Sequence, residues 1–179
     1  DWSIEDGSEA TTPITGTIAG KQFFVIENPK GHLNNGGDSI ILYDPTGKEI
    51  DRLTYGSWDD GNIANNARIA KDPKSLARKK DGLDSDNDYY DFSPTLTITK
   101  NAANIITQSV PKNNQNITQK TTNNVPTSSA VTGIYITELF PNPIGSDSEE
   151  EFIEVYNANE ETVDITGFIL GDGSSRRYT

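Results

Sequence analysis

The sequence predicts an all-β protein built from short strands. Its 179 residues include 15 Gly and nine Pro but no Met and no Cys, a composition typical of many turns. Strand-length apolar runs are separated by Asn, Gly, Asp and Pro, which is the pattern of hairpins and meanders. No segment repeats apolar residues with a period of 3.6 over more than two turns, so long helices are not expected.

Seven segments are expected to form strands. They are Trp2–Ile4, Gln22–Glu27, Ser39–Tyr43, Glu49–Tyr55, Ile134–Phe140, Glu151–Tyr156 and Asp164–Leu170. Ser39–Tyr43 is apolar on both of its faces, which predicts a central strand. Residues 44–47 (Asp-Pro-Thr-Gly) have the Pro and Gly of a tight turn, so the strands on either side should pair as a hairpin. Between residues 63 and 76 we expect at most a helical turn, because Pro73 interrupts the segment.

Composition divides the chain into three zones. Residues 1–104 carry a net charge of −6, residues 105–132 a net charge of +2, and residues 133–179 a net charge of −8. In the middle zone, Asn, Gln, Ser and Thr make up 17 of 28 residues, and neither acidic nor aromatic residues occur. Such a segment cannot bury enough apolar surface to offset its ordering entropy, so we expect a flexible linker.

The composition also excludes several classes of site. The absence of Cys removes disulfides, thiolate metal sites and cysteine nucleophiles, and a single His cannot build a multi-histidine metal site. The net charge of −12 disfavours nucleic acid as a partner of the whole chain. The longest apolar runs are far shorter than the roughly 20 residues of a membrane-spanning helix, so no transmembrane segment is expected.

Two segments far apart in the sequence are similar to each other. Residues 1–8 (DWSIEDGS) align with residues 167–174 (GFILGDGS) in an aromatic residue, an aliphatic residue and the Asp-Gly-Ser triplet. The simplest explanation is two tandem copies of one β domain. We therefore expect the chain to be a fragment that holds the end of one copy and the start of the next.

The motifs that follow resemble the lamin-tail domain family. The opening of the family is similar to residues 136–143 (ITELFPNP), 151–157 (EFIEVYN) and 163–170 (VDITGFIL). Its closing half is similar to residues 34–42 (NNGGDSIIL), 47–56 (GKEIDRLTYG) and parts of 78–92. The family's closing segment usually ends in P-T-P-G-x-x-N, whereas Pro94-Thr95 is followed here by Leu96, and Asn104 stands alone.

The resemblance implies an immunoglobulin-like β-sandwich. By that resemblance, residues 1–104 form the C-terminal part of one sandwich and residues 133–179 the N-terminal part of a second one. Because the missing parts are complementary, the chain is expected to fold as one circularly permuted sandwich, since a 28-residue linker reaches about 30 Å. Trp2–Ile4 and Phe168–Leu170 would then compete for one position.

The resemblance further implies a non-catalytic interaction or structural module of an exported or cell-surface bacterial protein. Such modules bind a protein or a cell-envelope polymer, and no cofactor is expected. Two alternatives remain: a module stabilised by Ca²⁺, and an accessory domain that targets a larger secreted hydrolase.

An aspartate-rich loop is the sharpest local motif. Asp84, Asp86 and Asp88 alternate at the spacing of a Ca²⁺-binding loop, with Asp81 and Asp91 on either side. The loop lacks the Gly after the third acid and the distant Glu of a helix-loop-helix calcium site. A polar loop whose side chains cap turns is therefore favoured over a metal site.

A basic stretch precedes and enters this loop. Its cationic residues are Arg68, Lys71, Lys74, Arg78, Lys79 and Lys80. One interpretation is a contact for phosphate or another polyanion. The favoured interpretation is neutralisation, because residues 68–91 hold six positive and six negative charges.

No catalytic residue is predicted. His32 lies in a turn-like Lys-Gly-His-Leu segment without a nucleophile motif. Residues 149–151, three consecutive Glu, and Glu154 have the chemistry of acid–base catalysts, but consecutive acids before a strand more often protect a sheet edge from aggregation.

Overall fold

The computed structural model describes residues 10–107, 133–144 and 150–172. The strands in chain order are β1 (Thr11–Pro13), β2 (Thr17–Ile18), β3 (Phe23–Glu27), β4 (Gly37–Tyr43), β5 (Glu49–Gly56), β6 (Ser75–Arg78), β7 (Phe92–Thr95), β8 (Ile134–Phe140), β9 (Phe152–Asn157), β10 (Val163–Asp164) and β11 (Ile169–Asp172). The helical elements are a 3₁₀ helix (Ile63–Asn65) and α1 (Asp88–Asp91). The prediction of an all-β protein is confirmed.

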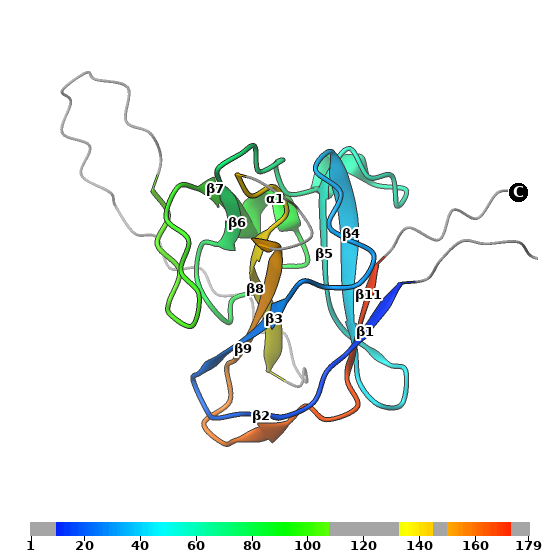
Figure 1. Cartoon of the computed structure of the whole chain (residues 1–179), viewed down its shortest axis with the longest axis vertical. Coiled ribbons are helices and arrows are strands. Elements are labelled where there is room, and N and C mark those ends of the chain that lie inside the picture. Colours follow the sequence, from blue (N-terminus) through cyan, green and yellow to red (C-terminus); the bar gives the residue numbers. More distant parts are fainter. Residues whose placement is uncertain (1–9, 108–132, 145–149, 173–179) are drawn as a thin grey trace, which may run out of the picture.

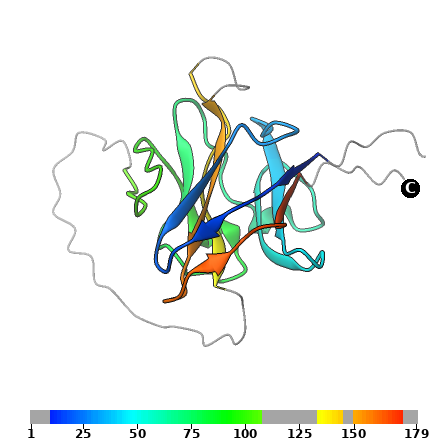
Figure 2. The ribbon, with the colours of Figure 1, turned by 60° about the horizontal axis from the view of Figure 1, so that its bottom comes forward.

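Two antiparallel sheets form the two layers of a sandwich (Figure 1). The first sheet has the strand order β1-β11-β4-β5, and the second has the order β3-β9-β8-β6-β7. A short ladder of β2 and β10 lies at one end of the layers, where the chain passes between the two sheets (Figure 2). The two sheets bury one apolar core between them.

Strands from both halves of the chain alternate within each sheet. In the second sheet, β8 and β9 lie between β3 and β6, and in the first sheet β11 lies between β1 and β4. Residues 10–107 and 133–172 therefore share one sandwich, as expected for complementary parts. The predicted competitor strand Trp2–Ile4 lies outside the described residues.

The core contains the inward-facing residues of both sheets. Leu53 of β5, Leu76 of β6 and Ile136 of β8 are fully buried, and Val155 of β9 is 1% exposed. Burying a side chain of this kind contributes roughly 1.5–3 kcal/mol each.

The hairpin predicted around residues 44–47 is present. The N–H of Gly47 donates to the carbonyl of Asp44 at 2.9 Å, and the strands β4 and β5 pair from Gly37 opposite Gly56 to Tyr43 opposite Glu49. Ile40, Ile41 and Leu42 are all buried, and β4 is paired on both sides, by β11 and β5. The prediction of a central strand is therefore confirmed.

The prediction of one strand over Asp164–Leu170 is wrong. The segment forms two strands, β10 and β11, because the chain turns between them: the N–H of Phe168 donates to Ile165 O at 3.1 Å, and Gly167 has φ +85. Gly adopts this left-handed conformation without steric cost, so the chain can leave one layer for the other here.

Candidate functional site

Arg78, predicted as part of a basic stretch, lies inside the protein. Its side chain is 1% exposed. Its Nε donates to the carbonyl of Ile136 at 2.9 Å, and its Nη2 donates to Asp51 Oδ2 at 3.2 Å. The guanidinium lies 4.5 Å from the ring centre of Phe92. Arg78 is therefore an internal cation that no external polyanion can reach, and the neutralisation interpretation holds for this residue.

The aspartate-rich loop turns three of its carboxylates toward groups of the protein itself. Asp84 Oδ1 lies 3.3 Å and Asp91 Oδ2 lies 3.7 Å from Nη1 of Arg78. Asp88 Oδ2 accepts from the backbone N–H of Thr54 at 2.8 Å, and burial raises the pKa of Asp88 to about 7. The arrangement is that of a loop anchored by its acids.

The remaining members of that loop do not complete a cation site. Asp86 is exposed, and its backbone N–H donates to Asp84 Oδ1 at 3.2 Å. Asp81 accepts from the side chains of Thr137 and Asn104. Within residues 10–107, 133–144 and 150–172, no group of three or more Asp, Glu, His or Cys side chains is placed to hold a metal ion.

His32 lies beside a buried glutamate. Its Nδ1 is 3.4 Å from Glu151 Oε2, and the same oxygen accepts from the backbone N–H of Leu33 at 3.1 Å. Glu151 is 1% exposed and Glu150 is exposed, while Glu149 lies outside the described residues. The contact ties the turn at His32 to the start of β9.

Two buried glutamates form a pair that the sequence analysis did not predict. Glu138 of β8 and Glu154 of β9 are register partners, and both are fully buried. Burial raises the pKa of both carboxyls, that of Glu154 to about 7. The sequence favours a sheet-edge acid at Glu154, whereas the structure buries it.

Residues 96–107 cover this pair. Thr99 donates to Glu138 Oε2 from its backbone N–H at 3.0 Å and from its hydroxyl at 2.7 Å. The backbone N–H of Asn101 donates to Glu154 Oε1. The segment thus seals the outer face of the second sheet through hydrogen bonds to two carboxyl groups.

Asn104 fastens the end of this segment. Its Nδ2 lies within hydrogen-bonding distance of Asp81 Oδ1 at 2.8 Å, the Thr137 carbonyl at 3.0 Å and the Arg78 carbonyl at 3.1 Å, which share its two hydrogens. The ordered chain continues beyond it, because the N–H of Thr107 donates to Thr95 Oγ1 at 2.9 Å. The predicted linker from residue 105 therefore starts too early by at least three residues; residues 108–132 lie outside the described part.

A groove of about 890 Å³ is a candidate binding site among the described residues. Its lining includes Gly56 at the end of β5, the segment 63–69 and Pro94 of β7. Ile63 and Ile69 are 52% and 36% exposed, so the groove offers apolar side chains to solvent. The groove wall is held by β5, since the N–H of Gly56 donates to Ala67 O and the N–H of Ala67 donates to Thr54 O, both at 2.9 Å.

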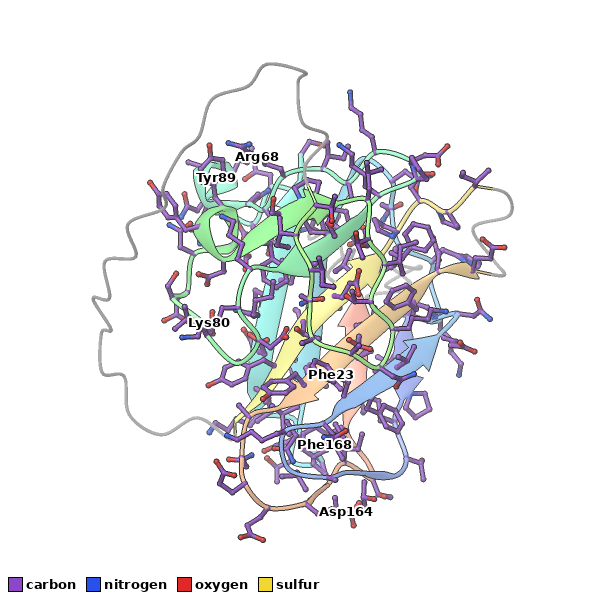
Figure 3. The ribbon with its side chains drawn as sticks, turned by 90° about the vertical axis from the view of Figure 1, so that its left-hand side faces the viewer. Phe23, Arg68, Lys80, Tyr89, Asp164 and Phe168 are labelled. Atoms are coloured by element: carbon purple, nitrogen blue, oxygen red, sulfur yellow. The ribbon has the colours of Figure 1, made fainter. Side chains whose placement is uncertain are left out.

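Arg68 and Tyr89 form a cationic and aromatic pair at the groove. The Nη2 of Arg68 donates to the Tyr89 hydroxyl at 2.7 Å, and Arg68 Cζ lies 5.0 Å from the centre of the ring. This hydrogen bond lowers the pKa of Tyr89. Figure 3 shows the two side chains next to each other at one end of the molecule, with Lys80 well apart from them.

The charge of the groove is opposite to that of the chain. Its charged lining residues are Arg68, Lys71 and Lys74, and no acid lines it, although the chain has a net charge of −12. In the part of the chain that the structure describes, no ion pair joins Lys71 or Lys74 to a carboxylate. Neutralisation, expected for the whole basic stretch, therefore applies to Arg78 but not to these two lysines.

Comparison with protein-family models, with curated proteins and with solved structures gave no match for this chain. No helix in the described ranges is long and apolar enough to cross a membrane.

Proposed function

We propose that this sandwich is a non-catalytic interaction module that binds an acidic, partly apolar segment of a partner protein in the groove. The observation that carries the proposal is the combination of Arg68, Lys71 and Lys74 with exposed Ile63 and Ile69 around one groove. Basic clusters recognise acidic segments by charge, and apolar contacts add the buried area that affinity needs.

The lining favours a peptide over a sugar polymer. Apart from its three cations, the groove is lined mostly by Gly, Ala, Ile and Pro, and its other polar side chains are those of Ser57, Asn66 and Tyr89. A carbohydrate needs many directed hydrogen bonds, whereas a peptide with acidic and aliphatic side chains matches cations and aliphatic walls. We therefore choose a protein as the partner, and a cell-envelope polymer becomes an outcome of the test.

The proposal includes an immunoglobulin-like, lamin-tail-like identity and a place in an exported or cell-surface bacterial protein. Its support is the set of motifs in residues 34–56 and 136–170. The two-layer antiparallel architecture is compatible with it.

Fluorescein-labelled decapeptides with alternating Glu and Leu test the groove, against decapeptides with Lys or Ser in place of Glu. The acidic peptides should bind best, and their affinity should fall several-fold between low and physiological salt. Lys71→Glu with Lys74→Glu should weaken binding by about tenfold or more.

Lys48→Glu with Lys80→Glu is the matched control, since it makes the same change in net charge at exposed positions outside the groove lining. It should alter affinity by less than about twofold. Equal loss in both double variants would place binding elsewhere. Binding of polygalacturonate in place of the acidic peptides would assign the groove to a polymer.

A further inference from the structure

The structure makes residues 133–172 an insert in the sheets of residues 10–107. Strands β8 and β9 are hydrogen-bonded neighbours between β3 and β6, and β11 is paired on both sides by β1 and β4. Without these strands, β3 would have no partner strand within the second sheet, and β1 would be separated from the first.

The insert also completes the core. Of the 21 buried residues in the main apolar cluster of the described chain, eight come from residues 133–172. They are Ile134, Ile136, Leu139, Ile153, Val155, Ile165, Phe168 and Leu170. Both portions supply side chains to this one core, so neither portion keeps its core residues buried without the other.

Polar contacts make this pairing specific. Asp51 Oδ2 accepts from the backbone N–H of Ile136 in β8 at 2.7 Å. The carbonyl of Ile136 accepts from Nε of Arg78 at 2.9 Å. Thr99 adds its two hydrogen bonds to Glu138. A β8 strand displaced by one residue would leave these buried groups unpaired, which fixes its register.

None of these contacts depends on which chain supplies the insert. The two portions are joined through the 25 residues 108–132, and the described sheet pairings stay the same whichever copy supplies residues 133–172. We propose that residues 133–172 of one copy complete the sandwich formed by residues 10–107 of a second copy. At low concentration the closed single chain dominates, because a tethered insert has an effective concentration in the millimolar range.

Two full-length variants, each broken in one portion, test the exchange. Leu53→Asp with Leu76→Asp disrupts residues 10–107, and Ile136→Asp with Val155→Asp disrupts residues 133–172; all four side chains are buried. Each variant alone should remain unfolded, because an unpaired carboxylate is placed in the core. When the two variants are refolded together, one supplies intact residues 133–172 and the other supplies intact residues 10–107.

The mixture should regain up to about half of the near-ultraviolet circular dichroism of the same amount of wild-type chain, since two chains can form one intact sandwich. Light scattering should give the refolded complex a mass twice that of one chain. Each variant refolded alone at the same total concentration is the control and should regain no signal. A mixture that stays as unfolded as its components, under conditions where the wild type refolds, would overturn the proposal.

Refolding the wild-type chain gives a second measurement. The dimer fraction isolated after refolding should increase with protein concentration, and dilution followed by unfolding and refolding should return it to monomer. A monomer at every refolding concentration, together with no recovery in the mixture, excludes exchange.

Discussion

Arg78 and Asp51 couple the two layers at the scale of single residues. Asp51 belongs to β5 of the first sheet, and Arg78 belongs to β6 of the second. Asp51 also accepts from two backbone N–H groups, those of Ile136 at 2.7 Å and Arg52 at 2.9 Å. A buried ion pair of this kind adds little net stability, but removal of one partner leaves the other charge uncompensated inside the sandwich.

Glu154 makes the stability of the protein depend on pH. Its pKa is raised from 4.5 to about 7 by burial, opposed by the hydrogen bond from Asn101 and increased by the neighbouring Glu138. The folded state therefore holds this proton more tightly than the unfolded state. The resulting stabilisation is complete below pH 4.5 and is lost as the pH rises through 7.

Glu154→Gln should abolish part of this dependence. The neutral amide keeps the volume of the side chain, so at pH 8 the variant should exceed the wild type in free energy of unfolding, by roughly 2 kcal/mol. At pH 5 the two proteins should be nearly equal in urea-unfolding experiments. Glu160→Gln, at an exposed side chain, is the control and should leave the pH profile unchanged. A variant that is less stable than the wild type at pH 8 would contradict the expectation.

Residue-level predictions from the sequence failed where burial broke the usual pattern. For Arg78 the sequence indicates neutralisation by the acidic loop, which the structure bears out, but it does not indicate that all four residues of β6 are buried. Glu138 and Glu154 were not predicted as a buried pair, because their environment is created by residues 96–107 from another part of the chain. A sequence shows the type of such residues but not what covers them.

The β4–β5 hairpin positions the groove at the scale of elements. Its open end pairs Gly37 with Gly56, and the backbone of Ala67 forms a bridge to the edge of β5 at Tyr55. Gly56 has φ +64, and a Cβ placed there would lie 2.3 Å from Gly36 O. The approach of these two backbones therefore requires glycine.

Gly56→Ala should destabilise the protein by roughly 2–4 kcal/mol, because a strained φ adds to a steric conflict with backbone. Gly47→Ala is the matched control: φ is +83 there as well, but a Cβ meets no atom within 4 Å. Gly47→Ala should lower the free energy of unfolding by about 1 kcal/mol. Urea unfolding measures both variants, and equal losses would show that the close approach of the hairpin backbones does not matter.

Strands of five or more residues were predicted well from the sequence. The predicted Gln22–Glu27, Glu49–Tyr55 and Ile134–Phe140 lie close to β3, β5 and β8. The short elements β1, β2, β6, β7 and α1 were missed, because two to four residues carry too little periodicity. Their positions come from pairing with distant strands. The groove was missed for the same reason, since its lining joins β5, residues 63–74, α1 and β7.

At the scale of the whole molecule, the alternation of the two portions in both sheets makes the sandwich independent of the continuity of the chain. A recognition sequence for a site-specific protease, inserted within residues 108–132, tests this property. After cleavage the two pieces should elute together in native buffer, because β8, β9 and β11 remain paired on both sides. In guanidinium chloride they should separate. Pieces that part and unfold in native buffer would contradict a shared sandwich.

The whole-molecule arrangement was partly foreseen. Complementary motifs in the two halves predicted a joint sandwich, and the strand order has that form. The covering of the outer face by residues 96–107 was not predicted. Thr99 contacts Glu138, 39 positions away, and Asn101 contacts Glu154, 53 positions away, and nothing in the sequence of residues 96–107 identifies these partners.

The position of β9 has a consequence for synthesis of the protein. Phe23–Glu27 pairs with Phe152–Asn157, so β3 must wait for more than a hundred further residues to be translated before its neighbour exists. At roughly 5–20 residues per second, that delay lasts several seconds or longer. During this interval the nascent chain carries unpaired strand edges outside the ribosome, and chaperones that shield such edges are the factors on which its yield should depend.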